Sequence, residues 1–218
     1  MEKYRNRIEA GEILAAELME YADRDDVVVL ALPRGGVPVA FEIAKALHVP
    51  LDVFIVRKLG VPGHSELAMG AIAMGDTCVF NEDIISELGI PKDAIDQIIE
   101  EEKKELKRRE VSYRGDHAFP SLKNKTIILV DDGIATGATM RAAIKALRKS
   151  QPAAIIVAVP VADKFMCEHM LPLMDRLVCP RRPLHFYAVG AWYEDFSQTE
   201  DEEVRDLLTR SRSFTHIH

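Results

Sequence analysis

The sequence has little of what marks a secreted, metal-stabilised or membrane-spanning protein. It contains only three cysteines in 218 residues, and no two have metal-ligand or CxxC spacing: Cys78, Cys167 and Cys179. An odd number of scattered cysteines is typical of reduced thiols in the cytosol. No apolar run approaches the roughly 18–20 residues of a membrane span, and the polar start MEKYRNRIEAGEIL does not resemble a signal peptide. These features predict a soluble cytoplasmic protein with no membrane partner.

Basic charge is also scarce. The formal net charge is −7, whereas a general nucleic-acid binder normally carries a basic balance or a stripe of Lys and Arg. The run EEKKELKRRE mixes acids with bases, which is typical of a solvated helix face. Nucleic acid is therefore not expected as a partner. Phosphate ligands stay open, because a helix N-terminus can hold a phosphate through its backbone N–H groups.

Hydrophobic residues are abundant, at 48% of the chain, which is enough for a sizeable core. The length suits one α/β domain with a small appendage. Short apolar segments alternate with helical patterns, and this alternation predicts a mostly parallel sheet covered on both sides. The expected strands are 27–32, 51–56, 126–130, 153–160 and 176–179, and the expected helices are 4–21, 38–47, 138–149, 163–174 and 201–209.

The middle of the chain departs from this alternation. Residues 57–68 contain two Gly and one Pro with little apolar periodicity, so we expect a mobile loop. Weaker strands over about 69–74 and 77–80 predict a hairpin, and 84–110 predicts a helix broken near Gly89.

The segment TIILVDDGIATGATM, residues 126–140, carries the strongest chemical signal. An apolar strand runs directly into two carboxylates, Asp131 and Asp132, and a small-residue loop from Gly133 to Thr139 then opens a helix. At the carboxyl edge of a parallel sheet, such a loop points its amides outward and suits a phosphate. A bulky side chain at Gly137 would hold the backbone away from that anion.

The two aspartates need a different partner, because carboxylates repel phosphate. They suit the hydroxyls of a sugar, or they could offset a cation or an oxocarbenium-like centre. Phosphate on the loop and hydroxyls on the acids together indicate a ribose 5-phosphate. A Walker A loop is the main rival, but no lysine follows the glycine as that motif requires. A surface turn explains the letters DDG alone, but not the whole string.

The string ILVDDGIATGAT resembles the phosphoribosyl pyrophosphate (PRPP) motif of type I phosphoribosyltransferases. Residues 33–36, Pro-Arg-Gly-Gly, match the position of that family's pyrophosphate loop, and residues 57–60, Arg-Lys-Leu-Gly, resemble the segment before the mobile loop of adenine phosphoribosyltransferases. Hypoxanthine–guanine enzymes carry an Asp, thought to act on the base, where this chain has Ala135. The terminal parts resemble a bacterial group known only as predicted phosphoribosyltransferases.

This resemblance implies the type I phosphoribosyltransferase fold, with a mostly parallel central sheet flanked by helices. We expect one domain over 1–218, with its core at about 22–180 and a small hood built from about 1–21 and 181–218. A homo-oligomer, most simply a dimer, is expected.

The resemblance also assigns the donor side of the site. Asp131 and Asp132 would take the ribose hydroxyls, and a Mg²⁺ cofactor would bridge pyrophosphate and ribose oxygens, held largely by the substrate. Arg34, Gly35 and Gly36 would hold the leaving pyrophosphate, with a strained or cis peptide accommodated in that turn. The residues implied around the 5-phosphate are Ala135, Thr136, Gly137, Ala138 and Thr139.

The mobile loop and its approach would complete the catalytic set. Arg57 and Lys58 would add positive charge where the leaving diphosphate develops charge, and residues 60–68 would close as a lid that excludes water. Glu66 is a candidate for proton transfer with the acceptor, and His64 is a second.

The acceptor side rests on the hood. Residues 189–195 resemble the hood segment of purine phosphoribosyltransferases, where an acid lies near the metal; Asp195 is the candidate here. Phe186 or Trp192 could stack on a heterocycle, although packing or a subunit interface explains these aromatic residues equally well.

Two functions remain open. One is an enzyme that transfers 5-phosphoribosyl from PRPP to a nitrogenous acceptor, most simply a nucleobase and in particular a purine, with release of pyrophosphate. The other is a regulator that senses PRPP or a nucleotide on the same fold without turnover. Arg34, Gly35, Gly36, Arg57 and Lys58 favour the enzyme, since a sensor of a nucleoside monophosphate needs no leaving-group apparatus. A PRPP-forming synthetase is not supported, because no ATP-binding motif is present.

Overall fold

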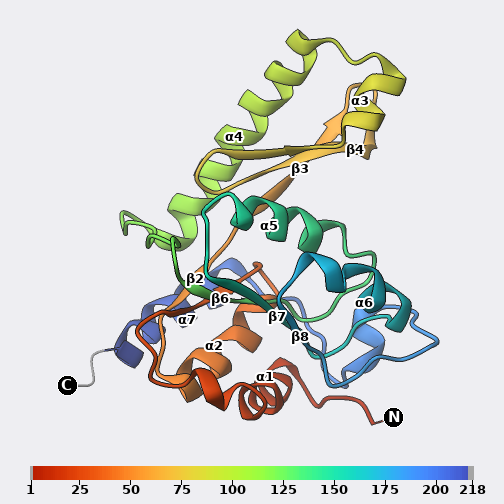
Figure 1. The fold of residues 1–218 in the computed structure, drawn as a ribbon. Helices are drawn as coiled ribbons and strands as arrows, with labels where there is room; N and C mark the ends of the chain where they lie inside the picture. The colour runs from red at the N-terminus through yellow and green to blue at the C-terminus, as the bar shows by residue number, and fades with distance from the viewer. Residues whose placement is uncertain (1, 216–218) are drawn as a thin grey trace.

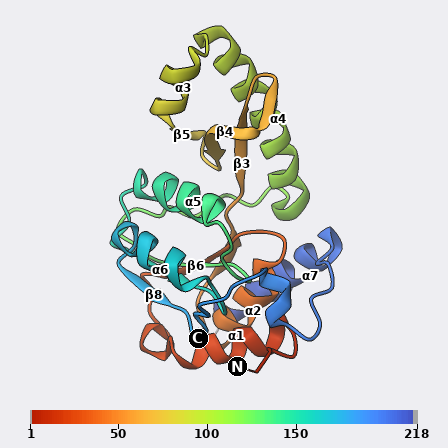
Figure 2. The ribbon, with the colours of Figure 1, turned by 90° about the vertical axis from the view of Figure 1, so that its right-hand side faces the viewer.

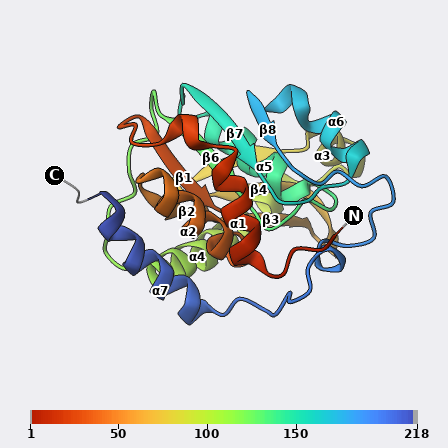
Figure 3. The same cartoon turned by 90° about the horizontal axis from the view of Figure 1, so that it is seen from below.

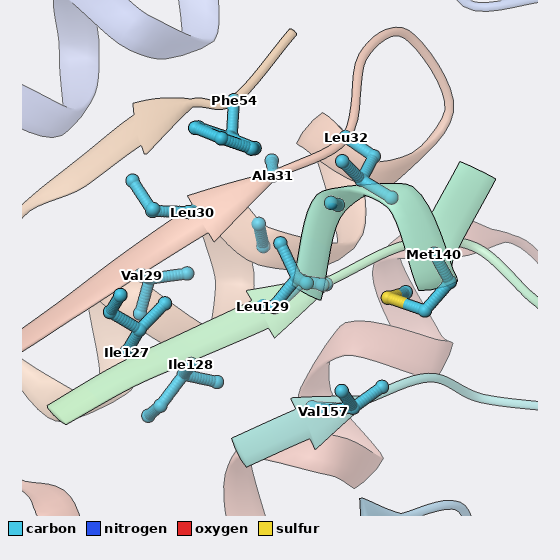
Figure 4. Packing of buried hydrophobic residues seen from close by; sticks show 14 of the residues in the cluster. Val29, Leu30, Ala31, Leu32, Phe54, Ile127, Ile128, Leu129, Met140 and Val157 are labelled. Atoms are coloured by element: carbon cyan, nitrogen blue, oxygen red, sulfur yellow. The ribbon is translucent and has the colours of Figure 1, made fainter. Parts of the chain in front are cut away.

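A five-stranded parallel sheet organises the computed structural model, which describes residues 2–215. Its strand order is β2-β1-β6-β7-β8. Every residue of β1 and β6 is buried, as expected for parallel strands covered on both faces. Figure 4 shows Val29, Ile127 and Leu129 of these two strands in the core. The strands are β1 (Val27–Ala31), β2 (Leu51–Val53), β6 (Thr126–Val130), β7 (Ala154–Ala158) and β8 (Arg176–Val178).

Helices cover both faces of this sheet (Figure 1). On one face, α2 (Gly36–Leu47) packs on β1 and β6, and α1 (Arg7–Ala16) and α7 (Asp201–Ser211) pack on α2. On the other face lies α5 (Ala138–Arg148), whose Met140 points into the core (Figure 4). The α6 helix (Lys164–Met170) connects β7 to β8. The predicted alternation of strands and helices is therefore confirmed for this part of the chain.

A second unit, residues 56–114, rises from the α5 side of the sheet, and we call it the arm (Figures 1 and 2). It holds an antiparallel sheet of order β3-β4-β5, whose strands contact α5. Its helices bury little: α3 has no buried residue, and α4 buries three of its 23. The arm consists of β3 (Val56–Val61), β4 (His64–Ala73), β5 (Thr77–Phe80), α3 (Glu82–Leu88) and α4 (Lys92–Arg114).

The loop predicted over residues 57–68 is wrong, because β3 and β4 form a hairpin there. Pro62 and Gly63 make the tight turn, with Gly63 at φ +78°. Residues 64–67 are all exposed at the hairpin tip, so they lack the apolar alternation that identifies a strand. The predicted strand 51–56 also divides, since β2 ends at Val53 and β3 begins at Val56. The hairpin across Gly75 and Asp76 is confirmed.

The helix predicted over residues 4–21 is shorter than expected. It begins at Arg7, after an Asn6 cap, ends at Ala16, and is followed by a 3₁₀ turn, η1 (Met19–Tyr21). Ile8 of this helix is exposed. A similar 3₁₀ turn, η2 (Leu171–Leu173), replaces the end of the predicted helix 163–174.

The start of the chain pairs with residues 192–195 of the C-terminal segment. Residues 2–21 and 181–215 are those predicted to form the hood, and we keep this name for them. The N–H of Tyr4 donates to the carbonyl of Trp192 (2.9 Å), and the N–H of Glu194 donates to the carbonyl of Tyr4 (2.7 Å). Figure 3 shows α1 and α7 on the same side of the molecule. Residues 189–195 include the 3₁₀ turn η3 (Val189–Trp192), and a further 3₁₀ turn, η4 (Arg212–Thr215), follows α7. Met1 and residues 216–218, also predicted to be in the hood, lie outside the described residues.

Candidate functional site

The end of β6 presents two adjacent carboxylates at the edge of the parallel sheet. The Asp131 carboxylate accepts the N–H of Asp132 (2.8 Å) and is partly buried. Burial, and next the neighbouring Asp132 carboxylate, raise the pKa of Asp131 well above its usual value. A group with a raised pKa at a sheet edge is a candidate for direct contact with a ligand.

Asp132 is held from two directions by the hood. Its carboxylate pairs with the Nε of Arg7 (3.2 Å), and both side chains are largely buried. Arg7 also donates to the carbonyl of Ser197 (2.6 Å) and lies over the ring of Phe196 (4.1 Å). The Tyr193 hydroxyl donates to the backbone carbonyl of Asp132 (2.6 Å), and burial raises the pKa of that hydroxyl. The hood therefore fixes both the side chain and the backbone of Asp132.

The loop after β1 lies directly against these aspartates. A Cβ added at Gly35 would stand 2.1 Å from the Asp132 Oδ2, and one at Gly36 would stand 2.8 Å from the Val130 carbonyl oxygen. Only glycine permits this approach. A cis peptide joins Pro33 to Arg34. It therefore lies at the start of the turn for which a strained or cis peptide was predicted, before Gly35 and Gly36. The Gly36 N–H donates within the loop to the Leu32 carbonyl (3.1 Å).

The loop after β6 leads into the N-terminus of α5. Gly137 has φ +78°, and a Cβ there would stand 2.8 Å from the Sδ of Met170, so this position requires glycine for conformation and for space. The other residues predicted around the phosphate are all exposed: Ala135, Thr136, Ala138 and Thr139. The loop thus offers accessible amides and hydroxyls to an anion. We call Asp131, Asp132 and the loops 33–36 and 133–139 the sheet-edge site.

Gly133 joins the sheet-edge site to the hood. A Cβ at Gly133 would stand 2.6 Å from Val189 and 3.1 Å from the Val161 carbonyl oxygen. The hood segment therefore packs against the residue that follows the two aspartates.

Two predicted residues of the arm, Lys58 and Glu66, line a cavity that the loop 133–139 also lines. Lys58, Glu66, Ala138 and Thr139 all line this cavity of about 760 Å³ between the arm and α5. The Lys58 ammonium donates to the Glu66 carbonyl. The His64 ring lies 3.7 Å from the Glu66 carboxylate.

The two predicted arginines are engaged elsewhere. Arg57 donates through Nε to Glu102 of α4 (2.8 Å). The Arg34 side chain extends toward α7, with its Nη1 3.6 Å from Asp201. Neither ion pair involves an aspartate of the sheet-edge site.

The acceptor-side candidates lie in and around the hood. Phe186 and Trp192 pack against a buried cluster that contains Tyr4 and Tyr193. Within residues 2–215, the Trp192 Nε1 is buried without a hydrogen-bond partner. The Asp195 carboxylate accepts the N–H of Ser197 (3.0 Å), and the Ser197 hydroxyl, followed by its N–H, lowers the pKa of Asp195.

Sequence reasoning missed Arg7 and the role of Tyr193. Arg7 stands in a polar helix start among other charged residues, and no local pattern distinguishes it from its neighbours. Tyr193 belongs to residues 189–195, which the sequence associates with the hood. Its contact with Asp132 was not foreseeable, since it depends on how the two ends of the chain meet.

Comparisons with known proteins agree with this arrangement. The sequence profile of the phosphoribosyl transferase domain matches residues 2–168. Two Mycobacterium tuberculosis proteins, provisionally named as phosphoribosyl transferases, are 41% identical over 211 residues, which is 97% of this chain. The chain spans about half of their length, 47%.

A solved structure supports the fold over nearly the whole chain. The protein TT1426 of Thermus thermophilus superposes with a TM-score of 0.83 at 36% identity, covering 95% of this chain and 98% of its own. In residues 2–215, no helix has both the length and the apolar composition to cross a membrane. With Asp131, Asp132 and the loop 133–139 at the edge of a five-stranded parallel sheet flanked by helices, this chain belongs to the phosphoribosyl transferase family.

Proposed function

We propose that the protein transfers a 5-phosphoribosyl group from PRPP to a nitrogenous acceptor, a nucleobase and preferentially a purine, and releases pyrophosphate. One observation carries this proposal: Gly35 lies so close to Asp132 that no side chain fits between them. The loop suited to a diphosphate and the carboxylates suited to a ribose thus adjoin in one site, as a diphosphate bonded to C1 of a ribose requires.

Each part of the sheet-edge site then has a distinct task. Asp131 and Asp132 accept hydrogen bonds from the ribose hydroxyls, and Arg7 keeps the Asp132 carboxylate in place. The amides at the start of α5 bind the 5-phosphate, where the helix dipole favours negative charge. Because these groups are fixed before the substrate arrives, they do not need to reorganise during the reaction.

Bond breaking leaves positive character on the ribose and negative charge on the leaving diphosphate. The Asp131 and Asp132 carboxylates stabilise the positive character on the ribose. Lys58 of the arm would add positive charge for the leaving diphosphate; it lines a cavity shared with Ala138 and Thr139 of the loop proposed to bind the 5-phosphate. Glu66 lines the same cavity and could exchange a proton with the acceptor.

The residues present fit a Mg²⁺ ion that the substrate largely holds. Carboxylate oxygens suit this hard cation, which usually keeps several waters and binds substrate phosphates. Within residues 2–215, no group of three or more acidic, His or Cys side chains gathers, so the chain would supply only one or two ligands. Asp131, Asp132 and Asp195 are the candidates, and the ion would supply charge neutralisation for the diphosphate.

The sensing function keeps one specific observation in its favour. Arg57 is paired with Glu102 and Arg34 with Asp201, so both predicted leaving-group arginines already have carboxylate partners. A protein that binds the donor without turning it over needs no cation free to follow the leaving group.

Pyrophosphate release measured with PRPP, Mg²⁺ and a panel of nucleobases tests the proposal. We expect turnover with at least one purine and none in the Asp131→Asn/Asp132→Asn double variant, whose folding is checked by circular dichroism. Calorimetric binding of PRPP without pyrophosphate release would favour the sensor. Absence of binding at millimolar PRPP would contradict both functions, whereas full activity in the double variant would contradict the roles given to Asp131 and Asp132. The dimer and the cytoplasmic location stay predictions.

A further inference from the structure

A second polar cavity adjoins the sheet-edge site through Pro33 and Arg34 but contains neither Asp131 nor Asp132. Its volume is about 200 Å³. It forms where the loop after β1, the C-terminal half of α4 and the start of α7 meet. Its lining residues are Pro33, Arg34, Arg108, Arg109, Ser112, Tyr113 and Asp201.

The lining of this cavity is strongly cationic, with three guanidinium groups and one carboxylate. Arg108 donates to Glu105 through Nε (2.9 Å) and Nη2 (2.6 Å), and Arg109 donates to it through Nε (3.1 Å). These hydrogen bonds lower the pKa of Glu105 to about 2, so Glu105 stays anionic and anchors both arginines. Each guanidinium carries five N–H donors, which leaves donors on both side chains for a ligand.

Asp201 acts as an exchangeable counter-ion for Arg34. The Tyr113 hydroxyl donates to the Asp201 carboxylate (2.7 Å) and, as the largest cause, lowers its pKa. The contact between Asp201 and Arg34 is longer, at 3.6 Å, and about half of the Asp201 side chain is exposed. An exposed ion pair at this distance contributes little. A phosphate group can replace it, because guanidinium groups bind phosphate oxygens in a bidentate manner.

The size of the cavity limits its ligand. A volume of about 200 Å³ corresponds to roughly seven water molecules and is below the range of about 300–1,000 Å³ found for drug-sized ligands. This size and the cationic lining suit a small polyphosphate anion better than a nucleoside. We propose that this cavity binds inorganic diphosphate, with Arg34, Arg108 and Arg109 as its ligands.

Arg34 connects this cavity to the sheet-edge site. Its backbone belongs to the loop that lies against Asp132, while its side chain lines the cavity. Diphosphate in the cavity would take Arg34 from Asp201 and so link α4 and α7 to the loop. That the natural ligand is diphosphate released in the reaction rests on the proposed function, whereas binding itself can be measured without turnover.

Calorimetric titration of the full chain with sodium diphosphate, in the absence of Mg²⁺, tests this site. We expect Arg109→Gln to weaken binding at least about tenfold, the loss expected for one charge-assisted contact. The matched control is Lys107→Gln, which removes the same charge from a nearby position of α4. Lys107 does not line the cavity, and about 71% of its side chain is exposed. This control should bind like the wild type.

A variant with the opposite sign makes the test stricter. Asp201→Asn removes the competing carboxylate but keeps an oxygen for the Tyr113 hydroxyl, so it should bind diphosphate more tightly. Arg108→Gln serves as a second loss variant if Arg109→Gln folds poorly by circular dichroism. Titration with orthophosphate and with ADP separates free diphosphate from a nucleotide-borne one, and we expect ADP to bind more weakly.

Two outcomes would overturn the site. One is that the wild type binds no diphosphate at millimolar concentration; the other is that Arg109→Gln and Lys107→Gln bind it equally. If either outcome is found in a protein that turns over PRPP normally, the diphosphate cavity is ruled out and the proposed function stands. Conversely, diphosphate binding lost in Arg109→Gln in a protein without transferase activity removes only the proposed function.

Discussion

The sheet-edge site and the arm differ in how firmly the chain holds their functional groups. Asp131 and Asp132 follow a strand whose residues are all buried, and Asp132 is further held by Arg7 and Tyr193. In the arm, residues 64–67 are exposed and α3 buries none of its residues. Segments with few buried contacts open at low free-energy cost. The carboxylates proposed to bind the ribose are therefore preorganised, whereas the cations of the arm stand on the part of the molecule best able to move.

The largest effect is expected where the sheet-edge site has least space. Gly35→Ala would place a methyl group against the Asp132 carboxylate, and a displacement of about 1 Å can cost about a hundredfold in rate. We expect a loss of that order in kcat/KM for PRPP. Gly63→Ala is the control in the arm: no atom lies within 4 Å of its Cβ position, so the change strains only the local turn, where φ is +78°, and it should retain most of the activity. Equal losses would remove the contrast between the two regions.

A smaller effect is expected from the hood contact with Asp132. Arg7→Gln removes the ion pair and should raise the KM for PRPP about tenfold, the loss typical of a hydrogen bond to a charged group. Arg7→Lys should recover part of this loss, because it restores the charge. Arg5→Gln is the matched control, since Arg5 is exposed and pairs only with Glu9 among the described residues. A kcat change without a KM change would argue against a positioning role.

At Asp131 we expect a substitution to raise the stability of the fold, whereas the preceding substitutions lower activity. Because its pKa in the folded protein is raised, ionisation destabilises the fold as the pH rises from about 4, the usual carboxyl range, through the raised value. Asp131→Asn should therefore raise the melting temperature at pH 7 by a few degrees. That gain should vanish near pH 4. A lower melting temperature at pH 7 would contradict this sign; Asp206→Asn, at an exposed position, serves as the control.

The smallest effect is expected in the arm. Glu102→Gln would release Arg57 from its ion pair and should lower the KM for PRPP about twofold, while the stability falls by at most about 1 kcal/mol, the range of partly exposed pairs. Steady-state kinetics and thermal melting measure the two. No change in KM would indicate that Arg57 has a structural role in the arm and no part in donor binding.

The sequence predicts the buried part of the fold well and the arm poorly, for one physical reason. The strand at 126–130 and the loop to Thr139 follow from continuous apolar residues and from glycine, which are local signals. The hairpin at residues 56–73 carries exposed residues at its tip, so its pairing depends on strand partners that no local pattern shows. Arg7 depends on the meeting of segments from both ends of the chain, which lies outside the reach of any local pattern.

The pairing of the two ends also bears on how the protein is made. Tyr4 bonds to the backbone of Trp192 and Glu194, and Arg7 reaches Ser197 and Asp132. Because synthesis runs from the N-terminus to the C-terminus, Tyr4 and Arg7 leave the ribosome well before the residues near 197 with which they pair. Contacts of such sequence separation form slowly. A nascent or truncated chain that lacks residues 192–197 would have its strands in place, but Arg7, which pairs with Asp132, would lack its contact with Ser197.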